Sequence, residues 1–213
     1  MNRTRLIAIA SIAAPIWFAV VYALVSLQRP DFRHFNQAVS ELGSWDAPNM
    51  WVWNCLGYFL TGMVICFLGL AVRQVFSPRG MASTPFVTLA LSGLFMAIAG
   101  VFPGDFENRS SLTMIFHTIG SFGSGLFFMI SAFWLPSVFK KVPSWKWLSI
   151  PLMLIAIGMV LNTFLVTTGP MPGLGQRIGF ACYLLWVALV GVALVKSPSP
   201  TNDTGQSTQE TTP

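Results

Sequence analysis

Six long apolar runs, separated by short polar segments, limit what this chain can fold into. They lie near residues 6–27, 51–72, 85–102, 113–138, 147–167 and 178–195. Each is close to the roughly 20 residues that an α-helix needs to cross a hydrocarbon core of about 30 Å. Only 9% of the residues are charged and 54% are hydrophobic, whereas soluble domains are about 25% charged. We therefore expect an all-α, polytopic integral membrane protein, with a six-helix transmembrane bundle over residues 1–196.

The distribution of basic residues predicts the orientation of this bundle. Eight lie on the side of the N-terminus: Arg3, Arg5, Arg73, Arg79, Lys140, Lys141, Lys146 and Lys196. Four lie on the other side: Arg29, Arg33, Arg109 and Arg177. Because lysine and arginine accumulate in cytoplasmic loops, both termini are predicted to be cytoplasmic. The net charge of +5 then reflects topology, and no nucleic acid partner is expected. The polar tail, 197–213, is expected to be disordered.

The longest loop, 28–50, carries a pattern typical of a short helix on the membrane surface. Phe32, Phe35, Val39 and Leu42 recur at spacings of three and four residues, between a proline and a glycine. This pattern predicts an amphipathic helix near residues 30–42, lying on the outer surface. The polar side chains of its other face are Arg33, His34, Gln37, Ser40 and Glu41.

His117 lies inside the fourth apolar run, after a short acidic loop that contains Asp105. An ionisable side chain inside a membrane helix costs roughly 2.5–3.5 kcal/mol on insertion scales, so it usually faces protein or water. Gly120, Ser121 and Ser124 share the helical face of His117 and would let a neighbouring backbone approach. His117 therefore either hydrogen-bonds a neighbouring helix or contributes to a ligand-binding or catalytic site.

Small residues recur at helical spacing in several of the runs, and this is typical of close helix packing in membranes. The third run has such a stripe at Gly93, Ala97 and Gly100. A weak internal repeat also pairs a polar residue with a glycine three positions later, at Asn54, His117 and Gln176. The repeat predicts three hairpins of similar design, each placing one polar side chain at the outer rim of the bundle.

Several stretches together resemble a bacterial and archaeal membrane family catalogued as domain of unknown function 998. They are Arg29-Pro30, Val39-Ser40-Glu41-Leu42-Gly43, Phe102-Pro103 followed by Asp105, then His117, and finally Arg177. The resemblance covers nearly the whole chain apart from the tail. It implies a six-helix membrane protein, and it implies no activity. We expect a multi-pass protein of a cell membrane, the prokaryotic plasma membrane.

Two functions fit the polar residues at the outer rim. In the first, a mixed set of charges binds a lipid head group or a membrane protein partner. The candidate ligand-binding residues are Arg33, Ser40, Glu41, Asp105, His117 and Arg177. We expect Glu41, Asp105, His117 and Arg177 to gather in one outer cavity.

In the second, the protein is a membrane hydrolase or another lipid-modifying enzyme acting at the outer leaflet. Its candidate catalytic residues are Ser40, Glu41, Asp105 and His117, with Ser40 as the nucleophile or with the acids and histidines around a metal. The chain has only two histidines, so a three-histidine zinc site cannot be built, and we expect no metal or other cofactor. An ion-coupled transporter is a poorer fit, because the middle of every run lacks charge.

Overall fold

A computed structural model describes residues 2–197, which are mainly helical and contain no named β-strand. Six helical segments are long and apolar enough to cross a membrane, as the sequence predicts. Five of them are built on α1 (Arg3–Ser26), α4 (Thr84–Val101), α5 (Leu112–Phe139), α6 (Ser149–Asn162) and α7 (Pro172–Lys196). The other joins α2 (Met50–Val52), a π-helical segment (Trp53–Phe59) and α3 (Leu60–Phe76). The predicted tail lies outside the described residues, apart from Ser197.

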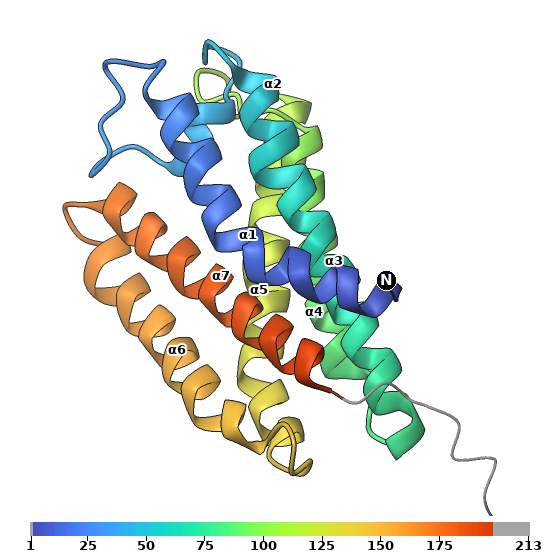
Figure 1. The fold of residues 1–213 in the computed structure, drawn as a ribbon. Helices are drawn as coiled ribbons and strands as arrows, with labels where there is room; N and C mark the ends of the chain where they lie inside the picture. Colours follow the sequence, from blue (N-terminus) through green and yellow to red (C-terminus); the bar gives the residue numbers. More distant parts are fainter. Residues whose placement is uncertain (1, 198–213) are drawn as a thin grey trace, which may run out of the picture.

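The six segments form one bundle in which α4 packs between α3 and α5, while α1 packs mainly on α7 (Figure 1). The start of α1 and the end of α7 lie at one end of the bundle. The other end holds the connections 27–49, 102–111 and 168–171, and we call it the loop rim. Among residues 2–197, the bundle therefore has the six long apolar segments that the sequence predicts.

Close backbone contacts hold α3, α4 and α5 together. A Cβ added to Gly93 of α4 would lie 2.2 Å from the backbone nitrogen of Cys66 in α3. A Cβ on Gly120 of α5 would lie 2.5 Å from the backbone nitrogen of Ala99 in α4. The predicted close packing at Gly93 and Gly120 is therefore confirmed, since no larger side chain fits at either position. Ser121, expected on the same face, is exposed.

Two π-helical segments near the loop rim are each linked to a glycine carbonyl by an asparagine. Asn54, in the segment Trp53–Phe59, donates its amide to the carbonyl of Gly43 at 2.9 Å. Asn162, which precedes the segment Thr163–Thr167, donates to the carbonyl of Gly175 at 2.8 Å. Asn162 was not part of the expected repeat at Asn54, His117 and Gln176, and the three similar hairpins stay a prediction.

α1 bends near its middle (Figure 1). Pro15 lies inside the helix, and a proline removes one helical hydrogen bond and pushes against the preceding turn. The hydroxyl of Ser11 donates to the carbonyl of Ile7 at 2.8 Å. The half of α1 beyond the bend carries Phe18 and Tyr22, which line a groove described below.

The amphipathic helix expected near residues 30–42 is not formed. The only helix there is a short 3-10 helix, Val39–Gly43. Two backbone N–H groups that a helix would use internally donate to side chains instead. The backbone nitrogen of Arg33 donates to the side-chain oxygen of Gln37, and that of Val39 donates to the side-chain oxygen of Gln176. Such side-chain acceptors compete with helical hydrogen bonds. Phe35, predicted on the apolar face, is 58% exposed.

Candidate functional site

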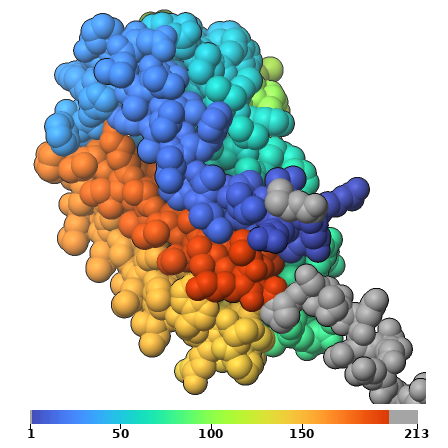
Figure 2. Space-filling model, viewed as in Figure 1, coloured from blue at the N-terminus to red at the C-terminus, as the bar shows by residue number. Residues whose placement is uncertain are grey.

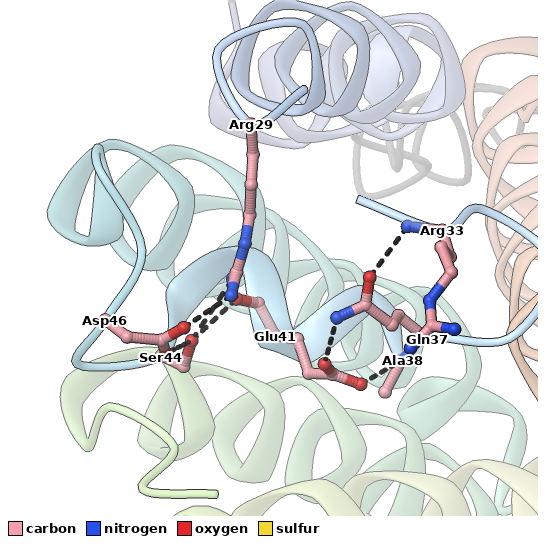
Figure 3. Close-up of polar contacts among 7 residues, drawn as sticks. All are labelled: Arg29, Arg33, Gln37, Ala38, Glu41, Ser44 and Asp46. Carbon is pink, nitrogen blue, oxygen red and sulfur yellow. Dashed lines mark hydrogen bonds and ion pairs between the residues drawn. The ribbon is translucent and has the colours of Figure 1, made fainter. Parts of the chain in front are cut away.

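The carboxylate of Glu41 is engaged within its own loop. One of its oxygens accepts a hydrogen bond from the backbone nitrogen of Ala38 at 2.7 Å, and the other accepts from the Gln37 amide at 2.8 Å (Figure 3). A carboxylate near the first turn of a short helix stabilises that turn. Glu41 thus acts as a cap for the 3-10 helix, and Ser40 lies half-buried beside it.

Arg29, which lies just after the end of α1, bonds two positions of the same loop. Its guanidinium donates to the backbone carbonyl of Glu41 at 2.6 Å and forms an ion pair with Asp46, which also accepts from Ser44 (Figure 3). Burial alone would raise the pKa of Asp46, but the Ser44 hydrogen bond and the Arg29 charge outweigh it, so this pKa lies below its ordinary value. Within residues 2–197 this is the one ion pair.

Asp105 is half-buried, and its carboxylate accepts a hydrogen bond from the backbone nitrogen of Asn108 at 2.9 Å. This local bond is typical of an Asx turn. Arg33 is exposed, and its backbone nitrogen and carbonyl, but not its side chain, take part in described hydrogen bonds.

His117 caps the end of a neighbouring helix. It is 3% exposed. Its Nδ1 lies 3.0 Å from the carbonyl oxygen of Ala99 and 2.9 Å from that of Phe102, and it donates its proton to these two acceptors. These carbonyls belong to the last turn of α4, where helical donors are lacking. His117 therefore fits the first of the two expectations, a hydrogen bond to a neighbouring helix. No described contact joins His117 to Asp105 or Glu41, and their gathering in one cavity stays a prediction.

Arg177 lies at the centre of a different group of side chains, which we call the Arg177 cluster: Arg177, Tyr22, Phe32 and His34. Nε of Arg177 donates to the Tyr22 hydroxyl at 2.7 Å. The guanidinium lies over the rings of Tyr22 and Phe32, with centroids at 5.2 and 5.3 Å, so cation–π attraction adds to the hydrogen bond. The Tyr22 hydroxyl also shares a hydrogen bond with Nδ1 of His34.

An apolar groove of about 280 Å³ runs from the Arg177 cluster along the border of α1 and α7. These two helices lie side by side on the face shown in Figure 2. Besides Arg177 and Tyr22, the groove is lined by Pro15, Phe18, Ala19, Val39, Phe180, Ala181 and Leu184. Arg177 and Leu184 are about 10 Å apart along α7 at 1.5 Å per residue. The groove thus has a cationic side chain at its loop-rim end and mainly apolar side chains along the rest of its length.

A family model described as a protein of unknown function (DUF998) matches residues 12–193. The chain belongs to the DUF998 family. No curated protein and no solved structure matches it.

This DUF998 chain has two features that the sequence prediction missed, the participation of Tyr22 and the groove itself. Tyr22 lies one turn before the end of α1, where an aromatic side chain is ordinarily attributed to the membrane interface. Of the six predicted ligand-binding residues, one lines the groove, Arg177. The other five are absent from its lining: Arg33, Ser40, Glu41, Asp105 and His117. Among the described residues, no three of His, Cys, Asp and Glu converge as metal ligands would.

Proposed function

We propose that this DUF998 protein binds a membrane lipid in the groove between α1 and α7, with the lipid head group at the Arg177 cluster. The loop rim would face the outside of a prokaryotic plasma membrane, as the distribution of basic residues suggests. One observation carries the proposal: a single groove combines apolar walls from two membrane-spanning helices with a cationic side chain at its rim end. Ligand sites are commonly concave and apolar, with a few polar groups that fix orientation.

The dimensions of the groove support a chain-like ligand. Its volume of about 280 Å³ is close to the lower end of the range of roughly 300–1,000 Å³ for small-molecule sites. Its lining includes Ala19 of α1 and Ala181 of α7, which are both small and exposed. A flexible hydrocarbon chain could therefore lie along the groove without displacing a large side chain.

A hydrolase acting at the same rim has less support. The two histidines are engaged elsewhere, since His34 bonds the Tyr22 hydroxyl and His117 bonds backbone carbonyls. A serine nucleophile needs a base within about 3 Å of its hydroxyl, and no described hydrogen bond joins Ser40 to either histidine.

Filling the groove tests the proposal. The Ala181→Trp variant places an indole ring in the groove without changing charge, and Leu154→Trp adds the same ring on an exposed position of α6. We expect protein purified in mild detergent to lose its co-purified lipid, measured by native mass spectrometry, in Ala181→Trp and to keep it in Leu154→Trp. Equal lipid retention by both variants and the unchanged protein would contradict the proposal.

A further inference from the structure

One nitrogen of the Arg177 guanidinium has no hydrogen-bond partner. An arginine side chain carries five N–H donors. Nε is bound to Tyr22, and Nη1 donates to the carbonyls of Gln37 at 3.1 Å and Gly173 at 2.5 Å. The rings of Tyr22 and Phe32 lie close to the group, with centroids 5.2 and 5.3 Å from its central carbon. Nη2 remains, and this buried nitrogen has no hydrogen-bond partner.

The positive charge of Arg177 also lacks a counterion. No carboxylate of residues 2–197 lies within 4.0 Å of its nitrogens. Glu41, the acid of the adjacent 3-10 helix, has both carboxylate oxygens occupied by Ala38 and Gln37. Arg177 is half-buried, and charges that are withdrawn from water are ordinarily paired. The site is therefore short of one negatively charged acceptor.

The surroundings of Arg177 restrict what can supply that acceptor. Arg177 lines the groove, and the walls that continue from it along α7 are Phe180, Ala181 and Leu184. A small hydrated anion would leave these apolar walls uncovered. An amphiphile would cover them with its chain while its head group reached Nη2.

We propose that the lipid carries an anionic oxygen, and that Nη2 of Arg177 recognises this oxygen while the hydrocarbon chain lies in the α1–α7 groove. This inference rests on the proposed function and adds the chemical class of the ligand. A phospholipid phosphate and the carboxylate of a free fatty acid share this chemistry. Charge-assisted hydrogen bonds to such oxygens are about twice as strong as neutral ones.

Pairs of lipids that differ only in the anionic group test the inference. Oleate is compared with oleyl alcohol, and phosphatidylglycerol with diacylglycerol of the same chains, by their binding to the detergent-purified full chain. We expect the anionic member of at least one pair to bind on the order of tenfold more tightly, the ratio that one charged hydrogen bond provides. Preference within the first pair only would identify a fatty acid, and preference within the second a phospholipid.

Two variants locate the charge that is recognised. Arg177→Gln should remove the preference, whereas Arg109→Gln, which removes the same charge from an exposed position at the loop rim, should keep it. Binding of both members of each pair with equal affinity would overturn the inference and leave the proposed function standing. Absence of binding by all four lipids would refute the proposed function as well. The lipid pairs decide this in the unchanged protein, so poor folding of Arg177→Gln would not weaken the test.

Discussion

Replacing His117 by leucine tests whether this buried histidine has a structural role. The substitution keeps an apolar side chain of similar bulk and removes the N–H that faces the carbonyls of Ala99 and Phe102. A buried acceptor left without a donor costs about 1–3 kcal/mol. The two carbonyls share one proton, so we count one loss, about 2 kcal/mol. For a chain of this length, this corresponds to a fall in Tm of about 4–8 °C.

The control is His117→Asn, because the asparagine Nδ2 lies the same number of bonds from the backbone as the histidine Nδ1. We expect asparagine to restore most of the lost stability, measured as the unfolding temperature of the purified protein in one detergent. The capping role would be refuted if the leucine variant unfolded at the temperature of the unchanged protein. Loss of bound lipid from a fully stable His117→Asn variant would instead assign His117 to the binding site.

Three further predictions address packing, pH dependence and topology. Gly93→Ala should destabilise the bundle because its new Cβ would meet the α3 backbone, whereas Gly125→Ala, with open space around it, should gain up to about 1 kcal/mol of helix propensity; thermal unfolding of both variants compares them. The stability that Asp46 contributes should be complete above its unfolded-state pKa of about 3.9 and be lost as the pH falls through its lowered folded-state pKa. The fall in stability of the unchanged protein should be below about 1 kcal/mol, because the Asp46 side chain is half-exposed. In the Asp46→Asn variant, unfolding measured across the same acid range should not show this fall. In a variant without its native cysteines, a membrane-impermeant thiol reagent should label Asp31→Cys in intact cells but leave Arg3→Cys unlabelled, and the reverse pattern would invert the proposed orientation.

The helices were predictable because their signal is local. Each apolar run must satisfy its own backbone hydrogen bonds in a bilayer, so length and hydropathy suffice to locate the spans. The glycines gave a second local signal, since Gly93 and Gly120 were expected at close contacts and lie at them.

The first loop was not predictable from its own pattern, because some of its hydrogen-bond partners are distant in sequence. Val39 donates to Gln176, and Gln37 accepts from Arg177 through its carbonyl. Both contacts span well over a hundred residues, and no periodicity within residues 30–42 could reveal them. Recognition of Tyr22 failed for the same reason, since its role depends on Arg177 at the other end of the chain.

The location of the groove beside Pro15 determines how a ligand would enter it. The groove opens on the outer surface of the bundle, at the exposed residues Ala19 and Ala181, and not in a central channel. A lipid could slide in sideways from the surrounding bilayer by two-dimensional diffusion, and its chain would never have to pass through water. Exchange would then depend on the local abundance of that lipid in one leaflet and not on its solubility.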